Sequence, residues 1–399
     1  MAKALAILLL ALLAFSGGAD AKRLKKVKVK RIESLAQTNA SFPSISFVGG
    51  LELSDGNEHF GGWSGLATRD QGRSAVAVSD KGWWLTLDVE YANDSTPVGV
   101  DDVRIHPLLD EVGKALDERK KAWSDAESVV FADKEDPTSG MLVSFERHHR
   151  IWSYESVEAN ATTNSALIVA SVALGAHCAY NGGAEGIEVL TPGVGSPRLA
   201  SMVFFCEDAM ADHPNIFQGW VVPVASDGET AQAKPIFMEL GEGYRPTDLA
   251  VLEGGDLLVL QRMHKGHDAT GMRIGLVPSD LIRWALRTSS PAYSASHEGE
   301  SVLVPAQVLE VIKSPTTLID NMEGLSLDYL GTNKEDPNRA VRLSLISDDN
   351  FRCAPPPLPS SHVVSSLPLS PLSLSFVVEF GLTLSCLSSF SFFVCSDLQ

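Results

Sequence analysis

The chain has 399 residues, of which 32 are Lys or Arg and 50 are Asp or Glu, so its formal net charge at pH 7 is −18. An acidic chain repels the phosphate backbone of nucleic acids, which excludes nucleic acid as the expected partner. The chain is long enough to bury a large core, and its 5 cysteines form neither a C-x-x-C motif nor a Cys/His zinc pattern.

The first 21 residues have the layout of a secretory signal peptide. Lys3 precedes an apolar run from Ala4 to Phe15, and small residues then lead to Ala19-Asp20-Ala21. The run is shorter than the roughly 20 residues that an ordinary membrane span needs. We therefore expect cleavage before Lys22 and secretion of the mature chain. An uncleaved anchor is the alternative.

Residues 22–40 form a basic N-terminal segment, because Lys22 to Arg31 read KRLKKVKVKR. Two interpretations stay open for this segment. It is either a solvated, flexible terminus or a surface that contacts an anionic partner. Because this segment is basic, the remaining residues have a more negative net charge than the chain as a whole. Such an acidic domain is expected to bind cations.

From residue 41 the sequence consists of short β-rich runs broken by Gly, Pro, Asn and Asp. The best helical periodicity covers residues 108–122, and a shorter helix is expected over residues 281–287. Helices are too few to alternate with the strands, so a parallel α/β sheet is not expected.

A strand pattern recurs along residues 41–352. In each unit a polar turn leads into a short apolar strand, and a second apolar strand ends in charged residues. Aligning the units on Ser64, Glu127, Glu185, Asp248 and Glu323 gives steps of 63, 58, 63 and 75 residues. Such self-similarity predicts an all-β fold, a β-propeller of about five or six blades.

The last unit is the best defined. A cluster from Asp320 to Gly324 opens one strand, and a second acidic cluster, Ser347 to Asn350, closes the next. If the two strands pair as antiparallel neighbours, both clusters lie on the same side of the sheet. Glu323 and Asp348 are then expected to lie close enough to share a cation.

Two features fit a secreted protein. Cys178 and Cys206 flank strands of the third unit and could pair in an oxidising compartment, although two free thiols fit the sequence equally well. Asn39, Asn93 and Asn160 each begin an Asn-x-Ser/Thr sequon, so they are expected glycosylation sites.

Residues 353–399 form a Ser-, Leu- and Pro-rich hydrophobic tail, which we expect to lie outside the propeller. No strand that would close the ring is recognisable in it. An altered reading frame or a retained intron would explain the break in composition. A lipid-anchor signal with Leu372 to Val394 removed, or a membrane span, are the alternatives, and Glu379 weakens the second. Membrane contact is expected only if the tail is a genuine anchor signal.

Nine short motifs occur between Phe47 and Phe351, in the order GGWSGLA, SDKG, DAES, FERHHRI, NGGAEG, YRPTDLAVL, LQR, DNMEG and SDDNF. With these motifs the sequence resembles the phytase-like (esterase-like) family. The resemblance implies hydrolysis of an ester or phosphoester. Members of the family generally continue with a strand after SDDNF, and this sequence departs from them there.

The acidic turns are candidate metal ligands. Carboxylates that converge on a propeller channel cannot all stay ionised without a cation, an arginine or a shared proton. Their oxygen atoms are the donors that Ca²⁺ prefers, so Ca²⁺ is the expected cofactor. The candidates are Asp80, Asp125, Glu127, Glu185, Asp248, Asp320, Glu323, Asp348 and Asp349.

Four arginines, Arg147, Arg150, Arg245 and Arg262, follow or flank the same turns and are candidates to bind a phosphate or carboxylate of a substrate. A metal ion facing arginines suits metal-assisted hydrolysis of a small ester or phosphoester by a monomeric enzyme. No catalytic residue is identified, because Gly62 to Leu66 lacks the second glycine of a G-x-S-x-G elbow. The alternative is a non-catalytic binding propeller whose acidic turns are structural.

Overall fold

The computed structural model describes residues 22–33, 45–93, 95–136, 138–190, 194, 200–223, 232–264, 270–288, 302–312, 321–331, 333 and 339–348, and the backbone of 373–383. No helix in these ranges is both long and apolar enough to cross a membrane. Several sequence predictions fall outside them, namely those for the signal peptide, Asn39, Asp320, Asp349, Cys353, Cys386 and Cys395.

The first two sheets of the propeller follow each other in the chain. The first sheet has the order β1-β7-β6-β5-β4, with β1 (Lys22–Arg23), β4 (Trp63–Arg69), β5 (Ser74–Ser79), β6 (Trp83–Tyr91) and β7 (Pro97–Pro107). The second sheet has three strands, β8 (Ala126–Phe131), β9 (Met141–Phe145) and β10 (Arg150–Tyr154).

The third and fourth sheets are each built on four antiparallel strands. The third contains β11 (Ala184–Leu190), β12 (Ser201–Cys206), β13 (Ile216–Pro223) and β14 (Lys234–Glu239), with β18 (Val302–Leu303) added in parallel at its edge. The fourth contains β15 (Tyr244–Val251), β16 (Leu257–His264), β17 (Thr270–Val277) and β19 (Ala306–Ile312).

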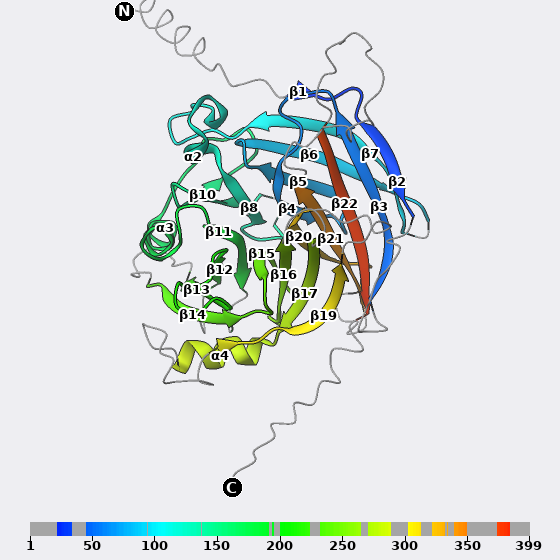
Figure 1. Ribbon diagram of the computed structural model, residues 1–399. Coiled ribbons are helices and arrows are strands. Elements are labelled where there is room, and N and C mark those ends of the chain that lie inside the picture. The colour runs from blue at the N-terminus through cyan, green and yellow to red at the C-terminus, as the bar shows by residue number, and fades with distance from the viewer. Residues whose placement is uncertain are drawn as a thin grey trace, which may run out of the picture.

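The last sheet joins the two ends of the chain. Its order is β2-β3-β22-β21-β20, with β2 (Lys28–Ile32), β3 (Ile45–Asp55), β20 (Asn321–Tyr329), β21 (Ala340–Asp348) and β22 (Ser373–Thr383). β22 pairs with β21 on one side and with β3 on the other (Figure 1). The expectation that the whole tail lies outside the propeller is therefore corrected for residues 373–383. Their alternating Ser and apolar residues were hidden by the unusual composition around them.

The sheets surround a central channel, which confirms the predicted propeller. The innermost strands are β4, β8, β11, β15 and β20, and each contacts the next around the ring (Figure 1). Four sheets have at least four strands, and the sheet β10-β9-β8 has three. About five or six blades were expected, and the described residues form four full blades and one incomplete blade.

The hydrophobic core lies in layers between neighbouring blades. Five clusters of buried apolar residues occur in the described chain, and each joins two adjacent sheets. Leu260 and Leu325 share one such layer, and Trp84 and Phe145 share another. The innermost strands are buried on both faces, and they contain polar as well as apolar residues, as in AESVVF of β8 and NMEGLSLDY of β20. The packed layers fix the inner strands and hence the residues at their ends.

Helices occur in the connections. The helix predicted over 281–287 is confirmed by α4 (Ser279–Thr288), whereas the one predicted over 108–122 is wrong. That stretch contains only η1 (Leu116–Glu118) and α2 (Lys121–Ser124). Oδ1 of Asp110 accepts the backbone amides of Val112 at 3.0 Å and Lys114 at 2.8 Å, and this turn takes the place of a helical start.

One helix was not predicted. α3 (Ser165–His177) lies in the connection between the second and third sheets, and Asn164 caps it by accepting the amide of Leu167 at 3.0 Å. Its apolar residues lie on all sides, and Ile168 and Val172 are 52% and 65% exposed. The helix therefore has no apolar stripe that a periodicity search could find.

Candidate functional site

The site begins with a β-bulge that every innermost strand contains. Each innermost strand pairs with the next strand of its sheet, which we call the second strand. Near the start of the innermost strand, one residue is left out of this pairing, and the register shifts there. A bulge of this kind bends the strand and re-aims one side chain. The bulged residues are all buried, and we call them the bulge ring: Ser64, Glu127, Glu185, Thr247 and Glu323.

The prediction that acidic residues occupy equivalent positions of successive blades is correct for Glu127, Glu185 and Glu323. It is wrong for Asp248, because the bulge of β15 contains Thr247. The sequence alignment is displaced by one residue there. Asp248 instead uses both carboxylate oxygens as acceptors for neighbouring blades.

The hydrogen bonds of Asp248 show a structural role. Its Oδ1 accepts the hydroxyl of Ser128 at 3.0 Å, and its Oδ2 accepts the amide of Leu325 at 2.7 Å. One carboxylate thus ties the second, fourth and last sheets together at the centre. Burial raises the pKa of Asp248, while the amides and the hydroxyl lower it. Asp248 is removed from the candidate metal ligands on this ground.

Neighbouring innermost strands pack closely at the level of the bulge ring. A Cβ on Gly65 would lie 2.7 Å from the Cα of Ser128. A Cβ on Gly186 would lie 2.8 Å from the Cα of Asp248. Only glycine permits such an approach. These glycines therefore let the strands that carry the bulge ring lie against each other.

A second ring lies at the ends of the second strands. In each blade, the residue just before the bulged residue pairs with a residue of the second strand, and the member of the second ring comes next in that second strand. For example, Ala126 pairs with Phe145, and Glu146 follows Phe145. The second ring consists of Asp80, Glu146, Glu207, Arg262 and Asp348. The sequence analysis missed Glu146 and Glu207 as ligand candidates. Their equivalence to Asp80 and Asp348, which also follow second strands, was the signal that could have identified them.

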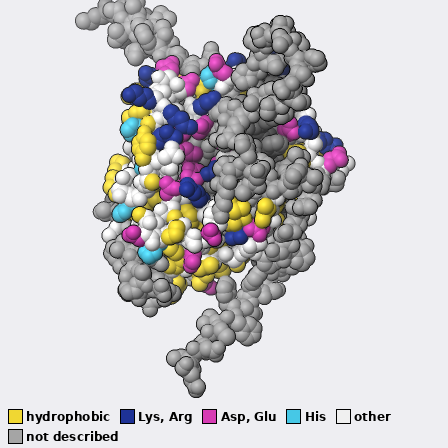
Figure 2. Space-filling model, viewed as in Figure 1, with side chains coloured by type: hydrophobic (Ala, Val, Ile, Leu, Met, Phe, Trp, Pro, Cys, Tyr) yellow, Lys and Arg dark blue, Asp and Glu magenta, His cyan; other side chains and the backbone are white. Residues whose placement is uncertain are grey.

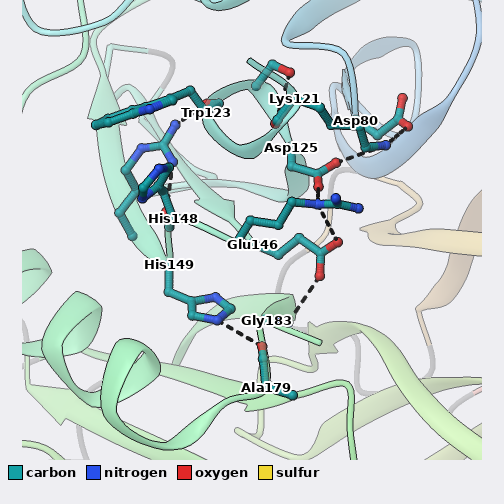
Figure 3. Close-up of polar contacts among 12 residues, drawn as sticks. Asp80, Lys121, Trp123, Asp125, Glu146, His148, His149, Ala179 and Gly183 are labelled. Atoms are coloured by element: carbon teal, nitrogen blue, oxygen red, sulfur yellow. Dashed lines mark hydrogen bonds and ion pairs between the residues drawn. The ribbon is translucent and has the colours of Figure 1, made fainter. Parts of the chain in front are cut away.

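The tightest group of acids lies on the second blade. Carboxylate oxygens of Asp125, Glu127 and Glu146 all lie within 4.8 Å of one another, and we call these three residues the acidic cluster. All three are buried. Lys121 Nζ lies 3.2 Å from Asp125 and 2.6 Å from Asp80. Figure 3 shows Lys121 between these two carboxylates.

Arg147 is the second cation of this group. Its Nε contacts the carboxylate of Asp125 and lies 3.7 Å from Glu146. The backbone amide of Gly183 donates to Glu146 at 3.5 Å (Figure 3). Asp80 and the acidic cluster carry four carboxylates, and Lys121 and Arg147 supply two positive charges. Two negative charges stay uncompensated when all four carboxylates are ionised.

Glu127 and Glu185 have no hydrogen-bond or ion-pair partner among the residues that the structure describes. Both are 7% exposed. Burial is the largest cause that raises the pKa of Glu127, and Glu185 and Asp125 raise it further. Burial also raises the pKa of Glu185, together with Glu207 and Glu323. A buried carboxylate without a partner is costly, so these two side chains point to a missing positive charge.

The opposite side of the site is organised by Arg262. Its Nη2 lies 2.5 Å from Glu207, and its Nη1 contacts Glu323 and donates to Asn321 at 2.7 Å. Burial lowers the pKa of Arg262, but Glu323 and Glu207 raise it by more. Arg245 lies beside this group and is 49% exposed, with Nη1 3.5 Å from Glu207 and 2.6 Å from Asp208. We call Arg262, Glu207, Glu323 and Asn321 the arginine network.

The strand pairing predicted for the last unit is confirmed, because β20 and β21 are antiparallel and Asn321 faces Asp348. Asp348 is one of the groups that raise the pKa of Glu323. The Oε2 atom of Glu323 is buried without a partner, while Oε1 accepts Arg262 and Asn321. A cation shared by Glu323 and Asp348 stays a prediction, since the compact acidic cluster forms on the second blade instead.

Arg150 is not placed to bind substrate. It is 8% exposed, and its guanidinium lies 3.8 Å from the ring centre of Phe145 and 4.2 Å from that of Trp152. It donates to the backbone carbonyls of His148 and Trp123. The aromatic rings and carbonyls hold it as a structural cation. Arg147, Arg245 and Arg262 do lie at the site.

Other predicted residues lie away from this centre. Cys178 and Cys206 form a disulfide with Cα atoms 5.4 Å apart. Asn93 and Asn160 are exposed on loops. Figure 2 shows Asp and Glu side chains interspersed with Lys and Arg near the centre of the face that carries the site.

The pKa values predict how stability depends on pH. Burial raises the pKa of Glu146 to about 7 and that of Glu323 to about 8. Unfolded glutamate has a pKa near ~4.3, so the folded protein binds more protons than the unfolded chain between about pH 4.3 and 8. Stability is therefore expected to fall as the pH rises through this window. Melting curves in chelator should give a lower Tm at pH 8 than at pH 6.

The control for this profile is Glu323→Gln, which removes one of the carboxyls whose pKa is raised. Its Tm should fall less steeply with pH than that of the parent protein. A parent Tm that climbs steadily from pH 6 to pH 8 in chelator would contradict the assignment of raised pKa values.

These features define a β-propeller in which buried acidic residues gather where the innermost strands begin, and we call the acidic cluster, Glu185 and the arginine network together the acidic site. The chain belongs to the phytase-like family: the family model described as "Phytase-like: Esterase-like activity of phytase" matches residues 58–351. No curated protein matches the chain.

Two solved structures are similar to the chain. One, described provisionally as a gluconolactonase, is 11% identical over 93% of this chain and 95% of its own, with a TM-score of 0.37. The other, U3-55K, is 9% identical over 82% of this chain and 76% of its own, with a TM-score of 0.31. At these TM-scores the likeness supports no argument about function.

Proposed function

We propose that the protein is a secreted, calcium-dependent hydrolase that cleaves an ester or phosphoester at the acidic site. The observation that carries the proposal is the pair Glu127 and Glu185, which are buried and have no partner among the described residues. Glu127 belongs to the group of charges with two negative charges in excess, and Glu185 raises its pKa further. A divalent cation supplies the charge that this group lacks.

The donor atoms fit a hard cation. Asp125, Glu127 and Glu146 offer carboxylate oxygens within 4.8 Å of one another, with no sulfur or imidazole nitrogen in the group. Oxygen donors favour Ca²⁺ over zinc. A bound Ca²⁺ would polarise an ester or phosphoryl oxygen and lower the pKa of a water molecule.

The residues around the cluster have separate tasks in this proposal. Arg245, which is half exposed, offers a planar guanidinium to an anionic group of the substrate. Arg262, whose side chain is 16% exposed, holds Glu207 and Glu323 in place. Arg147 fixes Asp125 and Glu146 beside each other.

Secretion has independent support. The disulfide between Cys178 and Cys206 is typical of proteins that fold in an oxidising compartment. Asn93 and Asn160, two of the expected glycosylation sites, are exposed. Both observations fit the signal peptide predicted for residues 1–21.

The test combines binding and turnover. Ca²⁺ should raise the Tm of the chelator-treated protein, because a ligand at about 100 times its Kd stabilises the folded state by about 2.7 kcal/mol. A panel of carboxylic and phosphoric esters should be hydrolysed with Ca²⁺ and not with chelator. Stabilisation without hydrolysis would favour the non-catalytic binding propeller. A protein indifferent to Ca²⁺ that still hydrolyses esters would refute the metal.

A further inference from the structure

A cavity of about 450 Å³ lies between the first and second blades and shares no residue with the acidic site. Its first wall is the face of the sheet from β5 to β7, and its second is formed by Phe131, Met141 and the turn 155–158. A volume of roughly 300–1,000 Å³ is typical of sites for small ligands.

The incomplete second blade explains why the cavity exists. The first sheet continues outward through β6 and β7, whereas the second sheet ends at β10. No strand of the second sheet stands opposite β7, and the turn that follows β10 closes the space instead. The polar side chains of β7, including Arg104 and His106, therefore line a cavity rather than a packed layer.

An added peptide strand is not the occupant. The outer edge of β10 is already used, because Ser153 and Thr162 exchange backbone hydrogen bonds at 2.9 and 2.8 Å. The amide of Ile151 donates to the hydroxyl of Ser171 at 3.0 Å. A strand from a partner would find these groups occupied. The cavity is thus suited to a small molecule.

Carboxylates outnumber arginines in the lining of the cavity. Arg104 donates to Asp102 through Nε at 3.1 Å and through Nη2 at 2.8 Å. The guanidinium of Arg69 lies 5.0 Å from the ring centre of Phe131. Against these two arginines stand the four carboxylates of Asp88, Asp102, Glu155 and Glu158, so the lining as a whole is acidic.

The carboxylates are not compensated. Asp88, Glu155 and Glu158 line the cavity, are exposed, and have no ion-pair or hydrogen-bond partner for their carboxylates in the described chain. At the wall, His106 is 3% exposed and its Nδ1 has no partner. Burial lowers the pKa of His106, Glu158 raises it and Arg104 lowers it, so the imidazole is neutral at pH 7 and one nitrogen is an acceptor.

We propose that this cavity binds a small organic diamine or polyamine. Its ammonium groups would lie near Asp88, Glu155 and Glu158 and donate to His106, and its carbon chain would lie against Phe131 and Met141. The proposal is independent of the hydrolase activity, because the two sites have no residue in common.

The probes are putrescine, spermidine and butanediol, which is the neutral analogue of putrescine. Calorimetric titration of the full chain should detect the two amines and not the diol, and added salt should weaken their binding because exposed charges are screened. The affinities should be the same with Ca²⁺ and with chelator. Equal binding of butanediol and putrescine, or no amine binding, would overturn the proposal.

Two double variants locate the site. Glu155→Gln with Glu158→Gln should weaken spermidine binding about tenfold, since two exposed charge pairs are lost. The control, Asp212→Asn with Glu239→Gln, changes the net charge equally at exposed positions that do not line the cavity. It should leave the affinity unchanged. If both double variants weaken binding to the same extent, spermidine responds only to the overall charge and the site is wrong.

Discussion

Replacing Arg262 with methionine is expected to lower the free energy of unfolding by about 3–5 kcal/mol at neutral pH. The side chain is 16% exposed and neutralises Glu207 and Glu323, each 7% exposed. Methionine would fill much of the space but would leave two buried carboxylates facing each other. The penalty comes from those uncompensated charges rather than from lost packing.

Urea unfolding at two pH values tests this expectation. The loss should be smaller at pH 5.5 than at pH 7.5, because Glu323 without Arg262 can become neutral by binding a proton. The control is Arg283→Met on α4, which breaks an ion pair with the 88% exposed Asp280 and should cost about 0.5 kcal/mol or less. Equal losses for the two variants would show that Arg262 does not organise the site.

Replacing Glu127 with glutamine should have two effects of opposite sign. In chelator the variant should melt at a higher temperature than the parent at pH 8, because a buried carboxylate without a partner has been removed. The variant should bind Ca²⁺ at least about tenfold more weakly than the parent, and its rate of ester hydrolysis should fall as a result. Thermal scans and calcium titrations measure both effects.

The matched comparison is Asp248→Asn, at a residue that the sequence also marks as a metal ligand. Its carboxylate accepts hydrogen bonds from Ser128 and Leu325, so the substitution should destabilise the fold by about 1–3 kcal/mol. Its calcium response should match that of the parent. If Asp248→Asn loses the calcium response and Glu127→Gln keeps it, the assignment of the acidic cluster is reversed.

Much of the ring could be predicted from the sequence because each blade repeats the same two strands. Glu127, Glu185 and Glu323 were placed correctly, since an acidic residue precedes a buried strand in each case. Thr247 was not, because an alignment guided by charge chose the neighbouring Asp248. A bulge shifts the register by one residue, and nothing in the local sequence of β15 marks where the shift occurs.

The contacts that each charged side chain makes could not be predicted from the sequence. Arg150 and Arg262 both follow acidic turns, yet one lies among aromatic rings and the other binds two carboxylates. Their difference depends on which blade each side chain faces, and that depends on the packing of strands far apart in the chain. The acidic cluster was missed as a unit for the same reason, because Glu146 comes from the strand beside that of Glu127.

The pairing of β22 with β3 has a consequence for synthesis of the protein. About 320 residues separate β3 (Ile45–Asp55) from β22 (Ser373–Thr383), so the ring cannot close until β22 has been synthesised. Until then β3 presents an unsatisfied edge, which is a template for pairing with other chains. A nascent chain stalled or cut before residue 373 would expose this edge permanently. Another molecule's β22 could then pair with it, joining two propellers through an exchanged strand.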